Sequence, residues 1–63
     1  MSLKKCPCCE KITLDAESLY EVCSNCGWED DPIQKDDPDF PGGANEMSLN
    51  QARKAYREGR SVQ

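Results

Sequence analysis

The fold is decided by two cysteine stretches, Cys6-Pro7-Cys8-Cys9 and Cys23-Ser24-Asn25-Cys26-Gly27-Trp28. A ligand set made of Cys6, Cys9, Cys23 and Cys26 leaves two residues inside each pair and residues 10–22 between the pairs. Two residues between thiolates let the backbone turn, so that both sulfurs point at one place. A second such turn completes a tetrahedron. We therefore expect these four cysteines to bind a structural zinc ion.

Cys8 is the fifth cysteine, and only Pro7 separates it from Cys6. Because this spacing is too tight for a metal-binding knuckle, we assign Cys9 as the ligand. Cys8 is then either a buried small apolar side chain or a redox-sensitive thiol. Iron in the same four thiolates is an alternative metal. Cys26-Gly27-Trp28 is compatible with a rubredoxin-type knuckle, although the spacer here is much shorter than in that family.

The length of 63 residues predicts one domain over residues 1–63, with flexible ends at residues 1–5 and 60–63. Such small domains commonly need a metal or disulfides in addition to their apolar core. Cysteines are odd in number, at five, and no apolar segment follows Met1-Ser2-Leu3-Lys4-Lys5 or approaches membrane-spanning length. We therefore expect a cytoplasmic protein without a membrane partner, held by metal because disulfides rarely persist in that compartment.

Histidine is absent from the sequence, which excludes His-dependent triads and His-ligated catalytic metals. The carboxylates that remain do not suggest a preorganised concave site in so short a chain. We therefore expect a protein that is not an enzyme.

Charge is unevenly distributed along the chain. Its net charge is −4, but residues 29–46 alone carry seven acids against Lys35, and residues 47–63 carry four cations against Glu58. A net negative charge on the protein disfavours binding to nucleic acid and predicts a protein partner with a basic surface. The cations Lys4 and Lys5, with those of residues 47–63, leave a nucleic-acid-binding zinc ribbon as a further alternative.

Regular structure is predicted at three places. The β-leaning runs Ile12–Leu14 and Leu19–Val22 flank a polar turn and predict a hairpin that joins the two knuckles. Residues 29–46 contain three prolines and a Gly-Gly pair, which predict a long acidic loop, with Ile33 and Phe40 pinning it to the core. Met47–Gly59 predicts an amphipathic helix, with Ser48 and Gln51 as a capping box.

The motifs also occur in a characteristic order. This order comprises Cys6-Pro7-Cys8-Cys9, Thr13-Leu14, Tyr20-Glu21-Val22-Cys23, Cys26, Trp28-Glu29-Asp30-Asp31, Gly42-Gly43-Ala44-Asn45, Ser48-Leu49, Ala52-Arg53 and Tyr56. It resembles the cysteine-rich CPCC family of small bacterial proteins. The resemblance implies zinc binding and supplies no activity. Glu10 departs from it, since the family usually has Gly after the double Cys.

Together these observations predict a small α+β domain: a metal-stapled, zinc-ribbon-like β-hairpin, a long acidic loop and one C-terminal helix. The function we expect is a zinc-binding interaction or regulatory module. An iron- or thiol-based redox protein, acting through rubredoxin-like electron transfer or through Cys8, is the alternative. The stretch Trp28-Glu29-Asp30-Asp31 is where we look first for a partner surface. With the nearby aspartates it could instead form an oxygen-ligand metal site or a solvated loop.

Overall fold

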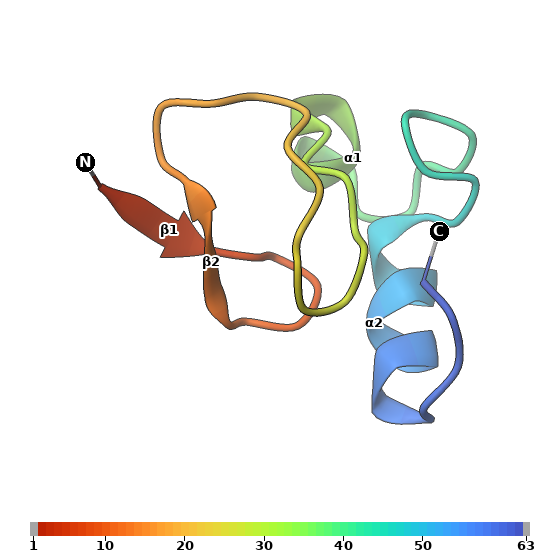
Figure 1. The fold of residues 1–63 in the computed structure, drawn as a ribbon. Coiled ribbons are helices and arrows are strands. Elements are labelled where there is room, and N and C mark those ends of the chain that lie inside the picture. The colour runs from red at the N-terminus through yellow and green to blue at the C-terminus, as the bar shows by residue number, and fades with distance from the viewer. Residues whose placement is uncertain (1, 63) are drawn as a thin grey trace.

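Two short strands and two helices make up the regular structure in the computed structural model, which describes residues 2–62. In chain order these are β1 (Leu3–Lys5), β2 (Ile12–Asp15), α1 (Pro32–Asp36) and α2 (Leu49–Arg57). Figure 1 shows the β1–β2 hairpin at one end of the molecule and α2 at the other, with the loops of the two cysteine stretches between them. The predicted small α+β class is confirmed.

The first cysteine stretch forms the turn of the β-hairpin. β1 pairs antiparallel with β2, placing Lys4 opposite Leu14, with an irregularity after Lys4. The predicted hairpin between residues 12–14 and 19–22 is therefore wrong. The strand that precedes Cys6 supplies the partner of β2, because the backbone N–H of Cys6 donates to the carbonyl of Lys11 at 2.8 Å and so continues the ladder through the knuckle.

The second cysteine stretch is the turn of a less regular ribbon. Val22 forms an isolated antiparallel bridge with Glu29, and the N–H of Tyr20 donates to the carbonyl of Asp30 at 2.9 Å. The N–H of Cys23 donates to the carbonyl of Trp28 at 2.8 Å. Only Val22 of the predicted run Leu19–Val22 forms a bridge, and Tyr20 has a left-handed φ of 59°. The chain before the second knuckle therefore pairs with the chain after it, whereas β2 pairs with β1.

Residues 29–46 were predicted to be one long loop, and α1 corrects this. Pro32 stands at the first position of the helix, where a missing N–H costs nothing, and Asp31 is the N-cap whose carboxylate accepts from the N–H of Ile33 at 2.8 Å. Ile33 and Phe40 do not pin the segment to the core, since they are 59% and 41% exposed.

The segment after α1 is held instead by buried amides. Gln34 is fully buried, and its side-chain nitrogen donates to the carbonyls of Phe40, Asn45 and Met47 at 2.9–3.1 Å. The side chain of Asn45 in turn accepts from the N–H of Glu29 at 2.9 Å and donates to its carbonyl at 2.8 Å. These bonds connect Glu29, Gln34 of α1 and the backbone of residues 40–47, so buried polar groups order this segment.

Helix α2 confirms the predicted helix and its capping box. The Ser48 hydroxyl accepts from the N–H of Gln51 at 3.1 Å, and the Gln51 side chain accepts from the N–H of Ser48 at 2.8 Å. Leu49, Ala52 and Ala55 form its buried stripe. Gly59 ends the last turn at φ 75°, a left-handed conformation that favours glycine.

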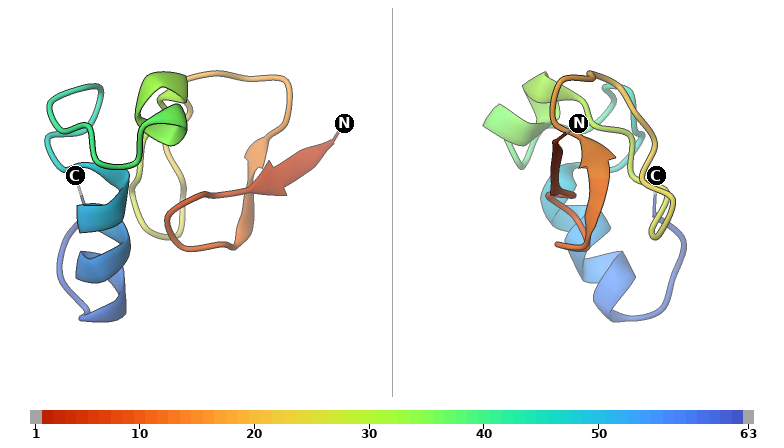
Figure 2. Two further views of the ribbon diagram at one scale, coloured as in Figure 1. Left: turned by 180° about the vertical axis from the view of Figure 1, so that it is seen from behind. Right: turned by 60° about the vertical axis from the view of Figure 1, so that its left-hand side comes forward.

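The core is small and lies between the cysteines, β2 and α2. It is formed by Cys6, Cys8, Leu14, Cys23, Trp28, Leu49, Ala52, Ala55 and Val62. The chain after α2 folds back beside the helix, as two further views show (Figure 2), and this brings the buried Val62 into the core. Of the ends expected to be flexible, residues 3–5 form β1 and Val62 is buried, whereas Met1 and Gln63 lie outside the described residues. Within residues 2–62, no helix is long and apolar enough to span a membrane.

Candidate metal centre

The two knuckles bring four cysteine sulfurs together. The Sγ atoms of Cys6, Cys9, Cys23 and Cys26 all lie within 4.8 Å of one another. Two of the separations are 3.6 Å, between Cys6 and Cys26, and 3.8 Å, between Cys9 and Cys23. Four sulfurs placed tetrahedrally at about 2.3 Å from a metal ion would be about 3.8 Å apart. The four sulfurs therefore fit a tetrahedral metal ion, and each knuckle contributes one buried and one partly exposed cysteine.

Both knuckles use the same backbone bonds to aim their sulfurs. In the first, the N–H of Glu10 donates to the carbonyl of Cys6 at 2.8 Å, and in the second the N–H of Gly27 donates to the carbonyl of Cys23 at 2.9 Å. Both donors have positive φ, 66° at Glu10 and 88° at Gly27. The departure at Glu10 therefore leaves the knuckle geometry unchanged.

The thiols of the centre differ in their acidity. Burial raises the pKa of Cys6 well above its usual range and that of Cys26 to about 12. Burial is also the largest single effect at Cys23, but there the Thr13 hydroxyl at 3.0 Å and the backbone N–H groups of Cys26 and Asn25 outweigh it and lower the pKa to about 6. A coordinated cation deprotonates such thiols outright, so this donor set suits a thiophilic metal.

Cys8 lies beside the centre but outside the group of four. Its side chain is 6% exposed, in agreement with the first of its two predicted roles, a buried small apolar side chain. Burial is the main reason that the pKa of Cys8 is raised to about 11. Lys4 pairs with Asp30, with its Nζ 2.6 Å from the carboxylate.

Helix α2 contacts both knuckles. The Arg53 guanidinium donates to the carbonyl of Pro7 at 2.8 Å, and the Asn25 side chain donates to the Tyr56 hydroxyl at 3.1 Å. A cavity of about 210 Å³ lies at this junction, lined by Cys8, Cys9, Glu10, Arg53, Tyr56 and Arg57. The two arginines place positive charge next to a centre whose four thiolates would carry an excess of negative charge around a divalent ion.

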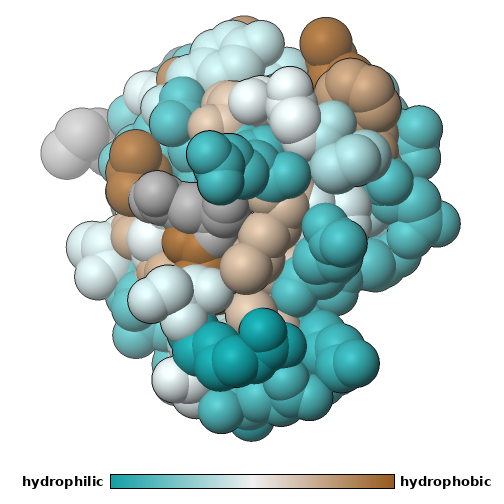
Figure 3. All heavy atoms as spheres, turned by 90° about the vertical axis from the view of Figure 1, so that its right-hand side faces the viewer, coloured by the Kyte–Doolittle hydropathy of each residue, from teal (hydrophilic) through white to brown (hydrophobic). Residues whose placement is uncertain are grey.

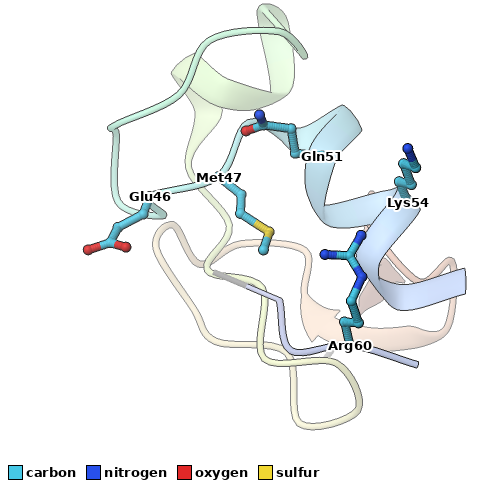
Figure 4. A pocket seen from close by; sticks show the side chains of 5 residues that line it. All are labelled: Glu46, Met47, Gln51, Lys54 and Arg60. Atoms are coloured by element: carbon cyan, nitrogen blue, oxygen red, sulfur yellow. The ribbon is translucent and has the colours of Figure 1, made fainter. Parts of the chain in front are cut away.

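A second, more open cavity of about 420 Å³ lies on the other side of α2. It is lined by Glu46, Met47, Gln51, Lys54 and Arg60, and Figure 4 shows Met47 at its centre with Arg60 beside it. No cysteine lines it. The face that includes α2 is mostly hydrophilic, with apolar residues restricted to a narrow strip and separate spots (Figure 3).

The acidic stretch that follows the second knuckle is largely part of the fold. Trp28 is fully buried, Asp30 is 3% exposed and pairs with Lys4, and Asp31 is 4% exposed. The Asp31 carboxylate caps α1 and also accepts from the N–H of Ala44 at 2.9 Å. The exposed acids of the segment lie further along, at Asp36, Asp37, Asp39 and Glu46.

Sequence reasoning did not identify the residues that surround the four sulfurs. Thr13 bonds to Cys23, Arg53 fixes the first knuckle, and Tyr56 reaches the second. Arg53 and Tyr56 lie three residues apart and so share one face of the helix, but only the fold shows that this face meets the knuckles. For Thr13 the sequence held one indication of its position. It lies one residue before the buried Leu14 of β2, so its side chain points to the opposite side of the strand.

Comparison with known proteins agrees with the cysteine pattern. No curated protein matches the chain at a significant level. A sequence profile of the family described as Cysteine-rich CPCC matches residues 4–61, which include both knuckles, α1 and α2. The chain therefore belongs to the cysteine-rich CPCC family.

Proposed function

We propose that this protein is a non-enzymatic interaction module whose four-cysteine centre holds a structural zinc ion. The observation that carries the zinc proposal is the group of four sulfurs within 4.8 Å of one another. Four thiolates complete a tetrahedral zinc shell and leave no position for substrate or water, so the ion serves folding. The free thiols suit the cytoplasm, where disulfides rarely persist.

The partner surface that we propose consists of α1 and the turn after it. Exposed Ile33 and Phe40 flank the exposed carboxylates of Asp36, Asp37 and Asp39. Backbone bonds keep this surface compact, because the N–H of Asp37 donates to the carbonyl of Ile33 and the N–H of Phe40 donates to that of Asp37. Apolar side chains framed by carboxylates favour a protein partner with basic residues around an apolar patch.

Elemental analysis of the purified full-length protein tests the metal. We expect one zinc per chain after growth in metal-replete medium. Stoichiometric iron with visible thiolate charge-transfer bands would refute the zinc assignment and favour rubredoxin-like electron transfer.

Affinity capture from the native host tests the partner surface. Wild-type protein is compared with Asp36→Lys, at an exposed acid whose side chain bonds to no described residue. Glu17→Lys makes the same change of charge at another exposed acid and is the control. We expect Asp36→Lys to lose a basic protein that wild type and Glu17→Lys retain, and added salt to weaken capture. Equal capture by all three proteins would refute this surface. Tight DNA or RNA binding at about 150 mM salt would favour the nucleic-acid alternative.

A further inference from the structure

Much of the apolar surface of this protein faces solvent. Among residues 2–62, seven large apolar side chains are exposed. Two of them, Ile33 and Phe40, belong to the acidic surface that we propose for a partner. Apolar groups that gather on one exposed face mark a contact surface, and Leu3 and Ile12 of the β-hairpin form a second such group.

The β-hairpin has one solvent-facing side. Leu3 and Ile12 are each 62% exposed, and the strand register places Lys5 directly opposite Ile12. Lys4, between Leu3 and Lys5, stands opposite the buried Leu14 and so belongs to the other side of the hairpin. Because side chains alternate along a strand, Leu3, Lys5 and Ile12 share the solvent side.

Positive charge on this side of the hairpin is available to a partner. The side chains of Lys5 and Lys11 are exposed and make no hydrogen bond or ion pair with any described residue, whereas Lys4 is paired with Asp30. The hairpin face, as we define it, consists of Leu3, Lys5, Lys11 and Ile12. It combines apolar side chains with unpaired cations, which is the combination that the proposed acidic surface requires.

Charge also decides which part of a second copy of the chain fits this face. The sheet has only two strands, so β1 has a free edge, but two β1 strands side by side would bring together Lys4 and Lys5 of both copies. Like charges on an edge strand oppose such pairing. The acidic surface carries the opposite charge, since the carboxylates of Asp36, Asp37 and Asp39 are exposed there against Lys35 alone.

We propose that the hairpin face binds the acidic surface of a second copy of this protein. In this contact the exposed apolar side chains of the two surfaces cover each other, and Lys5 meets the Asp36 carboxylate. The inference rests on the proposed function, because it uses the acidic surface proposed there and names a partner for it. Each copy carries both surfaces, so the association is head-to-tail and grows with protein concentration. A second copy and a host protein then compete for the acidic surface.

Sedimentation velocity of the full-length protein at rising concentration tests the proposal. We expect wild type to form species heavier than the monomer, and added salt to dissociate them. Lys5→Glu and Asp36→Lys each bring like charges together in the contact and should weaken self-association about tenfold. Lys54→Glu and Glu17→Lys make the same changes of charge at exposed residues outside both surfaces, and they should associate like wild type.

A mixture of the two weakened variants tests the pairing of the surfaces. Equimolar Lys5→Glu and Asp36→Lys place a carboxylate and an ammonium opposite each other again, with the charges exchanged, and should regain the association of wild type. Ile12→Ser, which changes no charge, should weaken association through lost apolar contact. Wild type that stays monomeric, or a mixture that associates no better than its components, would overturn the proposal. The proposed function would still stand if Asp36→Lys lost a host protein in affinity capture, and equal capture would refute the acidic surface itself.

Discussion

Glu10 and Gly27 hold the same place in the two knuckles. Each is the fourth residue after the first cysteine of its knuckle and donates its N–H to the carbonyl of that cysteine, at 2.8 Å and 2.9 Å. Each also has a positive φ, 66° and 88°. A side chain in this conformation is strained by about 1–2 kcal/mol, and glycine is not. The first knuckle therefore keeps the geometry of the second at an energetic cost.

Glu10→Gly is predicted to stabilise the protein. Relief of the strained backbone outweighs the greater freedom of glycine in the unfolded chain, which leaves a gain of about 0.5–1 kcal/mol in the free energy of unfolding. Urea denaturation of the metal-loaded protein measures this. Glu17→Gly, at an exposed acid without positive φ, should give no gain, and Gly27→Ala should lose about 1–2 kcal/mol. A Glu10→Gly variant no more stable than Glu17→Gly would contradict the prediction.

The knuckles and α2 could be predicted from the sequence because their signals are local. A C-x₂-C turn, a capping box and an apolar stripe each lie within a few residues. Strand pairing was mispredicted because it depends on a choice between partners. Residues 12–14 and 19–22 both look extended, and only the ladder through Cys6 decides that Leu3–Lys5 is the partner of β2.

The acidic segment was mispredicted for a different reason. Its prolines argue against a helix in the sequence, although Pro32 at the first helical position is compatible with one. Its apolar residues were expected to anchor it, but Gln34 and Asn45 do so. A polar residue gives no sign in the sequence that it is buried, because burial requires partners from distant parts of the chain.

Gln34→Ala is predicted to destabilise the protein by about 2–4 kcal/mol, since it leaves buried carbonyls and the side chain of Asn45 without their partner. Gln34→Glu should cost at least as much, because a carboxylate cannot donate to three carbonyls. Chemical denaturation checks both values. Lys35→Ala, at the exposed next residue of α1, is the control and should change stability by less than about 0.5 kcal/mol. A small effect of Gln34→Ala would show that the amide network does not stabilise the segment.

Gly43→Ala tests how closely the chain approaches this network. A Cβ atom at Gly43 would lie 2.5 Å from Asp31 Oδ2 and 2.9 Å from two carbons of Gln34. We expect a loss of about 1–3 kcal/mol through overpacking, measured by thermal denaturation. Gly42→Ala is the informative comparison, because a Cβ atom at Gly42 would meet no atom within 4 Å. Gly42 has φ 79°, so the stability that Gly42→Ala loses should come from backbone strain alone, at about 1–2 kcal/mol. A fully tolerated Gly43→Ala would contradict this packing.

Asp31 is predicted to make the free energy of unfolding depend on pH in the acid range. The N–H of Ala44, followed by those of Ile33 and Gln34, holds the pKa of the Asp31 carboxyl below its ordinary value of 3.8. A group whose pKa is lower in the folded state stabilises the fold above its unfolded pKa and loses this effect as the pH falls through the folded value. Asp31→Asn should therefore flatten the stability curve below about pH 4 and cost about 1 kcal/mol at neutral pH. Unfolding followed from pH 3 to 7 checks this, and a curve parallel to that of wild type would contradict it.

Removal of the metal is predicted to unfold the protein. The four sulfurs bring the two knuckles to one point, and a structural zinc ion contributes about 10–16 kcal/mol to folding. Excess EDTA should abolish the near-UV circular dichroism of Trp28, which is fully buried beside the second knuckle, and added zinc should restore it. Cys6→Ser should behave like the metal-free chain, whereas Cys8→Ser should retain the signal until EDTA is added. A metal-free protein with an unchanged Trp28 signal would show that the small core folds alone and that the four cysteines serve something other than folding.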